Sequence, residues 1–247
     1  MKNARKQYYS YIKNLIDEIY TSQSSNIENA INAICDAIEN KKSIFSFGAS
    51  HAGIITQELF YRAGGLALIN PIFLKETLLD VRPITQTSKM ERLPGYGSVA
   101  LEAYDIKKGD IIIITSVSGR NDVSIDMAIK AKEKGAIIIA ITNLKYSSSV
   151  KSRHRSGKRL FELADIVIDN CGVEGDACVK LDQLKQKVSP SSTIAGAFIV
   201  NSIVAGVCEE LIDRGIEPPV FYSSNVDGGD DKNKEIFKKY KKQIRYM

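Results

Sequence analysis

Two runs of branched aliphatic residues restrict the fold of this chain more than any other feature of its sequence. Residues 111–115 have the sequence IIIIT and residues 136–141 have the sequence AIIIAI, so both segments are apolar on their two faces. Strands of this kind are typical of the centre of a parallel sheet, where helices cover both faces. Residues 121–134 lie between them, have a helical pattern and end at Gly135. The sequence therefore predicts an α/β core.

The alternation of strands and helices continues over most of the chain. Further strands are expected at 43–47, 66–70 and 165–169, and further helices at 5–20, 24–38, 50–62 and 191–214. This order indicates a doubly wound fold with three α-β-α layers and right-handed crossovers. Residues 74–97 have no clear pattern. We divide the chain into N-terminal helices that cover the core or a partner subunit (1–42), an α/β core (43–215) and a C-terminal extension (216–247).

The net charge of +5 belongs to one end of the chain. Residues 232–247 contain seven basic residues and one acidic residue, so the rest of the chain carries a net charge of −1. We interpret this basic tail as a solvated amphipathic helix or arm. No recognisable nucleic-acid-binding module accompanies it, so we expect no nucleic-acid partner.

Other motifs that would assign a location or a cofactor are missing from the sequence. The N-terminus lacks the pattern of a signal peptide, and no run of 18 apolar residues occurs, so a cytoplasmic protein is expected, without a membrane partner. The four cysteines show no C-x-x-C spacing, and only two histidines could join them, so we expect reduced thiols and no metal. Neither a G-x-G-x-x-G nor a P-loop motif is present, and no cofactor is predicted.

Small polar residues follow two of the predicted strands and open the last long helix. These segments have the sequences GASH (48–51), TSVSGRN (115–121) and SST (191–193). Ligands of open α/β sheets bind at the carboxyl ends of the strands, and phosphate favours N–H groups, hydroxyls and helix N-termini. The alternative is that each segment is only a capped turn. The candidate phosphate ligands are Gly48, Ser50, Ser116, Ser118, Gly119, Asn121, Ser191, Ser192 and Thr193.

These segments resemble a known family. TSVSGRND is similar to the S-x-S-G-x-[ST/N] phosphate loop of SIS (sugar isomerase) domains, and FGAS is similar to their first G-x-S loop. SGKRLFELADIVIDN, SSTIAGAFIVNSI and PPVFYSSNVDGGD resemble stand-alone bacterial SIS proteins, so the likeness covers nearly the whole chain. It implies a five-stranded parallel sheet, a homodimer or tetramer with sites near the subunit interfaces, and phosphate held by Ser50, Ser116, Ser118 and Asn121. Val117 stands where such loops often have glutamine.

Two residues of the first predicted helix are candidates for catalysis. His51 and Glu58 are seven residues apart and therefore lie on nearly the same helix face. Aldose–ketose isomerisation requires a base, and a partly desolvated carboxylate is suited to that role. Glu58 also matches the helix carboxylate that acts as base in the heptose-phosphate isomerases of this superfamily. The alternatives are an ion pair between Glu58 and Arg62, and a helix-cap or subunit-contact role for His51.

A second proton carrier is not evident from the sequence. Heptose-phosphate isomerases carry a histidine on the last long helix, and this chain has none between residues 193 and 214. Either His51 or His154 of a neighbouring subunit would have to supply it. Residues 145–159 (KYSSSVKSRHRSGKR) form either a solvated loop or a lid whose Arg153, His154 and Arg155 close over an anionic sugar.

The sequence thus predicts a protein that binds a phosphorylated sugar and isomerises it by proton transfer with a carboxylate base. One alternative is a non-catalytic sensor of phosphosugars that acts through a partner protein. Another is a lyase or etherase that acts on an amino-sugar phosphate.

Overall fold

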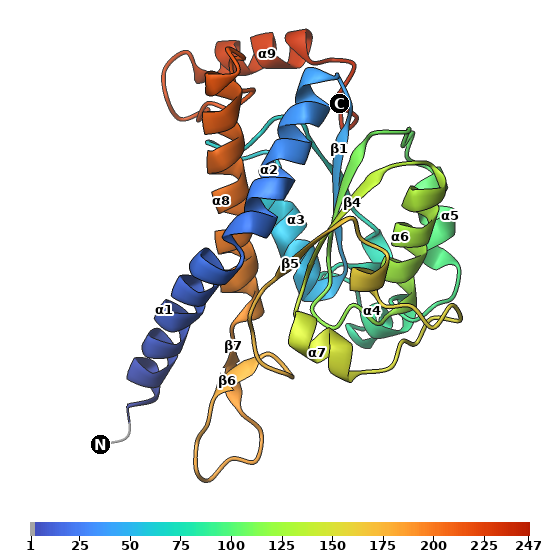
Figure 1. Ribbon diagram of the computed structural model, residues 1–247, viewed down its shortest axis with the longest axis vertical. Coiled ribbons are helices and arrows are strands. Elements are labelled where there is room, and N and C mark those ends of the chain that lie inside the picture. Colours follow the sequence, from blue (N-terminus) through green and yellow to red (C-terminus); the bar gives the residue numbers. More distant parts are fainter. Residues whose placement is uncertain (1–2) are drawn as a thin grey trace.

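The computed structural model describes residues 3–247 and contains a five-stranded sheet with helices on both faces (Figure 1). The strands are β1 (Ile44–Gly48), β2 (Ile69–Ile72), β3 (Ile111–Thr115), β4 (Ile137–Thr142) and β5 (Ile166–Asp169). Their order is β2-β1-β3-β4-β5, and every neighbouring pair is parallel. The predicted doubly wound parallel sheet is confirmed, and so are the five strands that the family resemblance implied.

The helices are divided between the two faces of the sheet. Residue bounds are α1 (Ala4–Ser22), α2 (Ser24–Glu39), α3 (Gly53–Leu59), α4 (Thr85–Met90), α5 (Tyr96–Glu102), α6 (Asp122–Glu133), α7 (Leu144–Ser149), α8 (Ser192–Asp213) and α9 (Gly229–Lys239). Single 3₁₀ turns are η1 (Ser50–Ala52), η2 (Lys75–Thr77) and η3 (Leu160–Glu162). Figure 1 shows α2, α3 and α8 on one side of the sheet and α5 and α6 on the other. This arrangement is the three-layer α-β-α architecture that the sequence predicts.

Successive residues of the central strand pack into two separate cores. Ile111 and Ile113 lie in a core with α2, α3 and α8, whereas Ile112 and Ile114 lie in a core with α5 and α6. Strand side chains alternate between the faces of a sheet. A strand between two helical layers must therefore be apolar at every position, which explains the run of four isoleucines.

Two predicted elements differ from the structure in their limits. The helix expected at 50–62 begins as η1 and ends at Leu59, because Phe60 has an extended backbone with φ −95° and ψ 135°. The strand expected at 66–70 is found at Ile69–Ile72 and includes Pro71. Because β2 is an edge strand, it tolerates a residue without an N–H group.

Several structured segments, among them α4, were not predicted from the sequence. Strands β6 (Ala177–Val179) and β7 (Val188–Pro190) form a separate antiparallel pair. Helix α7 follows β4 within the basic segment 145–159.

The C-terminal extension is docked on the body of the protein rather than solvated. Helix α9 is amphipathic, as expected, but the residues after it run along strand β2. The Asn70 amide donates to the carbonyl of Gln243 (3.0 Å) and accepts from the N–H of Arg245 (2.6 Å). The prediction of a solvated arm is therefore wrong for residues 243–246, because backbone groups of this segment complete the hydrogen bonds of the buried Asn70 side chain.

The N-terminal segment forms two consecutive helices, as predicted. Gln23 joins α1 to α2, and α2 packs along α8 (Figure 1). Residues 1 and 2 of the expected 1–42 segment lie outside the described residues. Within residues 3–247, α8 is the one helix long and apolar enough to cross a membrane. Its buried residues, which include Ala195, Ile199 and Ile203, belong to the core with α2 and α3.

Candidate functional site

A polar cavity lies at the carboxyl ends of β1 and β3. Its volume is about 260 Å³, just below the ~300–1,000 Å³ typical of small-ligand sites. Strand β1 pairs with β2 on one side and with β3 on the other, so the strand order reverses at this position. Such a reversal is where open α/β sheets bind their ligands. The cavity is lined by Ala49, Ser50, His51, Ala52, Glu91, Thr115, Ser116, Val117, Ser118, Asn121, Ser124 and Tyr146.

The loop after β3 presents several hydrogen-bonding groups that no other part of the described chain uses. Within residues 3–247, the hydroxyls of Ser116 and Ser118 form no hydrogen bond, and the N–H groups of Ser118, Gly119 and Arg120 have no acceptor. The loop leads directly into the N-terminus of α6, where a helix favours negative charge. Free hydroxyls and N–H groups at this position are suited to an anion.

Several buried polar atoms in and beside this loop have no partner in the described residues. They include Oγ1 of Thr115, a residue that is 5% exposed and lines the cavity, and Nε of Arg120. A buried polar group without a hydrogen bond costs about 1–3 kcal/mol. Such a cost is typical of a site that a ligand completes.

Glycines set the shape of both strand-exit loops. Gly119 has a φ of 56°, and a Cβ atom there would lie 2.9 Å from Oγ of Ser147. A Cβ atom on Gly48 would lie 2.3 Å from the carbonyl oxygen of Ala52, so the chain turns too tightly there for a side chain. Ser50, two residues after Gly48, has a φ of 50°, a conformation that is uncommon for residues other than glycine.

Glu91 joins the two strand-exit loops across the cavity. Its Oε1 atom accepts a short hydrogen bond from the Ser50 hydroxyl, and its Oε2 atom accepts from the Asn121 amide at 2.7 Å. The carbonyl of Glu91 accepts from the N–H of Val123 (3.1 Å), which fixes the residue to the start of α6. Ser50 and Asn121, both predicted to hold phosphate, therefore hold a carboxylate in this structure.

The basic segment 145–159 reaches the rim of the cavity through Arg153. Its Nη1 atom donates to Oδ1 of Asn121 at 2.7 Å. Burial, together with repulsion from Arg120 and Arg92, lowers the pKa of Arg153. Arg120 and Arg92 therefore lie close enough to Arg153 for their positive charges to act on it, and positive charge near the cavity favours an anionic ligand.

The two residues predicted to be catalytic lie in different places. His51 lines the cavity. Glu58 does not, because its carboxylate pairs with the guanidinium of Arg62 and accepts from the Asn201 amide at 2.9 Å. The ion pair that the sequence offered as the alternative for Glu58 is therefore present.

The structure does not bring His154 or the start of α8 into the cavity. His154 is 7% exposed, and its ring nitrogens bond to Asp126 (3.1 Å) and Ser156 (2.8 Å). Ser191 and Ser192 donate their N–H groups and hydroxyls to the carboxylate of Asp176. These serines therefore bind the Asp176 carboxylate at the N-terminus of α8. Thr193, the next residue, is also absent from the lining of the cavity.

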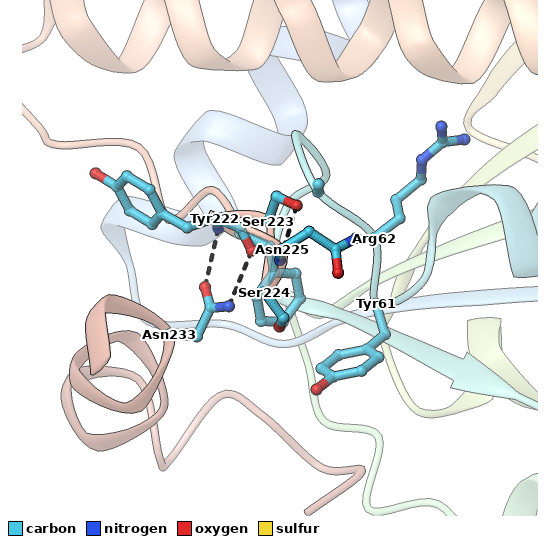
Figure 2. Close-up of a pocket in the computed structure, with 9 residues that line it drawn as sticks. Tyr61, Arg62, Tyr222, Ser223, Ser224, Asn225 and Asn233 are labelled. Carbon is cyan, nitrogen blue, oxygen red and sulfur yellow. Dashed lines mark hydrogen bonds between the residues drawn. The ribbon is translucent and has the colours of Figure 1, made fainter. Parts of the chain in front are cut away.

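A second cavity, of about 190 Å³, lies between the loop after α3 and the C-terminal extension (Figure 2). Some of its polar groups are already used. The Asn233 side chain bonds to both backbone groups of Tyr222 at 2.9 Å, and Arg62 extends away from the other labelled residues toward its pair with Glu58 (Figure 2). The side chains of Tyr61, Ser224 and Asn225 form no hydrogen bond within the described residues, but this cavity does not lie where the strand order of the sheet reverses.

Two functional candidates were missed by sequence reasoning. Glu91 lies just after α4, in the segment 74–97 whose pattern predicts no element, and Tyr146 lies in α7. In the sequence, Glu91 is only one acidic residue in a segment without a clear pattern. That signal does not specify a site, because the path of such a segment depends on long-range packing.

An open parallel sheet with a polar cavity where its strand order reverses defines a class of α/β proteins that bind small ligands at the strand ends. The chain belongs to the SIS domain family, whose model matches residues 7–143. It is 53% identical to a UPF0309 protein of Oceanobacillus iheyensis, over 98% of both chains. It is 43% identical to a UPF0309 protein of Listeria innocua, over 93% of both chains. The predicted family is thereby confirmed.

Solved structures share the fold at low sequence identity. A phosphoheptose isomerase from Francisella tularensis has a TM-score of 0.54 and 16% identity, and the match covers 85% of this chain and 100% of that one. A phosphoheptose isomerase from Neisseria gonorrhoeae has a TM-score of 0.50 and 14% identity, with 83% and 95% covered. At such identities the likeness concerns the fold alone.

Proposed function

We propose that this protein binds a phosphorylated sugar in the cavity between β1 and β3 and catalyses its aldose–ketose isomerisation. The observation that supports this most directly is the set of unused donors on the loop after β3. The hydroxyls of Ser116 and Ser118 and the N–H groups of residues 118–120 are free to take the phosphate. The N-terminus of α6 and the nearby arginines add favourable electrostatics.

The rest of the cavity suits the sugar and its chemistry. Polar side chains of His51, Glu91 and Tyr146 also line the cavity, and each can bond to a hydroxyl or a carbonyl of a sugar. Isomerisation requires a group that takes a proton from carbon and a group that exchanges protons with the sugar oxygens. A carboxylate and a histidine can supply both. The solved relatives described as phosphoheptose isomerases support this reaction class.

We also propose a cytoplasmic homo-oligomer, as the family resemblance implies. Helix α8 leaves apolar side chains at its surface, among them Ile194 (38% exposed) and Ile212 (63% exposed). A second subunit that covered this face would lie beside Asn201 and Glu58. Sedimentation velocity would measure the assembly directly.

A thermal-shift experiment tests the binding half of this proposal. Pentose, hexose and heptose monophosphates, and more weakly inorganic phosphate, should raise the melting temperature, whereas NAD and ATP should not. A ligand at about 100 times its dissociation constant stabilises the folded protein by roughly 2.7 kcal/mol. A clear shift with NAD and none with any sugar phosphate would contradict the assignment.

A substitution at Ser118 locates the binding site. Ser118→Leu removes a donor and fills part of the cavity, so it should abolish the shift without unfolding the protein. Ser148→Leu is the matched control, because Ser148 is exposed and does not line this cavity. Equal binding by the parent and Ser118→Leu would place the phosphate elsewhere.

A further inference from the structure

Glu91 is the one carboxylate among the twelve residues that line the cavity. A general base must lie within about 2.6–3.2 Å of the proton it removes, or be linked to it through one water molecule. Glu58, the carboxylate that the family resemblance favours, lies outside the lining and is already paired with Arg62. The structure therefore brings a different carboxylate to the position where a bound sugar would lie.

The contacts of Glu91 hold its carboxylate in place without using all of its acceptor sites. Ser50 bonds to one oxygen and Asn121 to the other, while Val123 anchors the backbone. A carboxylate offers about four lone-pair sites, so two remain for a substrate. These contacts come from both strand-exit loops and from the start of α6. A group held from three elements is preorganised for proton transfer.

The cavity contains free donors as well as donors that Glu91 already uses. The hydroxyls of Ser116 and Ser118 are unused, whereas Ser50 and Asn121 are occupied by Glu91. Phosphate is repelled by a carboxylate and will bind where donors are free. A phosphosugar with its phosphate on the loop at residues 116–120 would place the rest of its chain in the same cavity as Glu91.

We infer that Glu91 is the catalytic base of the isomerisation, an inference that depends on the proposed function. In the open-chain aldose, a carboxylate oxygen of Glu91 takes the proton from C2. The C2–H electron pair forms the C1=C2 bond, and the C1=O π pair moves to O1, which takes a proton from the imidazolium of His51. Neutral His51 then removes the O2 proton as C2=O forms, and the Glu91 carboxylic acid returns its proton to C1. The sum is an aldose converted to a ketose, with both side chains restored.

Deuterium exchange and binding, measured on the same variants, test this role. Glu91→Gln keeps the size of the side chain, and its amide can still accept from Asn121 and donate to Ser50. In D₂O with pentose, hexose and heptose monophosphates, this variant should lose isomerisation and carbon-bound deuterium incorporation by about 10²-fold or more. Its thermal shift with inorganic phosphate should remain. Glu58→Gln is the matched control and should retain exchange.

Each outcome separates this inference from the proposed function. Exchange by Glu91→Gln at the parent rate would overturn the role of Glu91 and leave the isomerase proposal standing. Exchange lost in Glu58→Gln and kept in Glu91→Gln would assign the base to Glu58. If the parent binds sugar phosphates but exchanges none of them, both the base and the isomerase reaction fail while the binding site stands. If the parent binds no sugar phosphate, the proposed function itself fails.

Discussion

The imidazole of His154 lies 3.1 Å from a carboxylate oxygen of Asp126, and both side chains are almost fully buried, at 5% and 6% exposed. This contact ties the basic segment 145–159 to helix α6. The second oxygen of Asp126 has no partner in the described residues. The pair therefore holds the segment against the core beside the cavity and keeps His154 from acting as a mobile lid residue.

Removal of the His154 ring should strongly destabilise the protein. His154→Ala leaves the buried Asp126 carboxylate without this hydrogen bond, and an unsatisfied buried polar group costs about 1–3 kcal/mol, or more when it is charged. Urea denaturation would measure the loss, with Arg155→Ala as the control, because Arg155 is exposed and should change stability by less than about 0.5 kcal/mol. The double variant Asp126→Leu with His154→Leu should recover much of the loss. A His154→Ala protein of unchanged stability that no longer binds sugar phosphates would instead support the lid.

Glu58 should contribute to stability rather than to turnover. Its ion pair with Arg62 is part-exposed, at 29% and 46% of the side chains, and pairs of this kind contribute only about 0.3–0.5 kcal/mol. Glu58→Gln should therefore lower the free energy of unfolding slightly, and Glu58→Gln combined with Arg62→Gln should lower it little further. A 10²-fold loss of turnover in a fully folded Glu58→Gln would restore the role that the resemblance implied.

The sheet could be predicted from the sequence because its signals are local. The run at 111–114 is apolar at every position, which only a strand between two helical layers requires. The prediction ended the edge strand before Pro71, whereas β2 includes this residue. An edge strand tolerates a proline and a central strand does not, and the sequence of one segment does not reveal which strands pair with it.

The candidate site was predictable only where it lies next to a strand. Ser116 and Ser118 follow β3 directly and share the predicted cavity. Glu91 and Tyr146 enter the same cavity from segments whose direction depends on tertiary packing. Nothing in the sequence around His154 distinguishes a histidine that is hydrogen-bonded in the core from one that contacts a ligand. Patterns along the chain therefore located the loop but not the carboxylate opposite it.

Gly119 should be more sensitive to substitution than a glycine of similar backbone conformation in open space. Gly119→Ala combines the positive φ with contacts of 2.9 Å to Ser147 and 3.2 Å to Leu160, so we expect a loss of about 1–3 kcal/mol beyond the backbone cost. Gly157 has a φ of 70°, and a Cβ atom added there would meet no atom within 4 Å, so Gly157→Ala should cost only about 1–2 kcal/mol. Urea denaturation compares the two. Equal losses would mean that the loop adapts easily, and phosphate affinity should fall only in Gly119→Ala.

The C-terminal residues should stabilise the fold of their own chain. The Tyr246 hydroxyl donates to the carbonyl of Ala67 at 2.7 Å, and its ring packs edge-to-face on Phe60 with centroids 4.9 Å apart. Tyr246→Phe should cost about 1 kcal/mol, and Tyr246→Ala should cost roughly 2–3 kcal/mol because the ring is only partly buried. Neither change should alter the affinity for inorganic phosphate, because Tyr246 does not line the cavity.

The dependence of stability on pH offers an independent test of the same contact. Burial raises the pKa of Tyr246 above its ordinary value of 10.0. The unfolded chain therefore loses this proton at a lower pH than the folded protein does. The stability that the neutral phenol contributes is complete below about pH 10 and falls as the pH rises toward the folded-state pKa. Tyr246→Phe cannot ionise, so its stability should decline less steeply above pH 10 than that of the parent. If the stabilities of the parent and of Tyr246→Phe decline in parallel above pH 10, and the two proteins differ in molecular mass in sedimentation, the C-terminal residues instead dock on a neighbouring subunit.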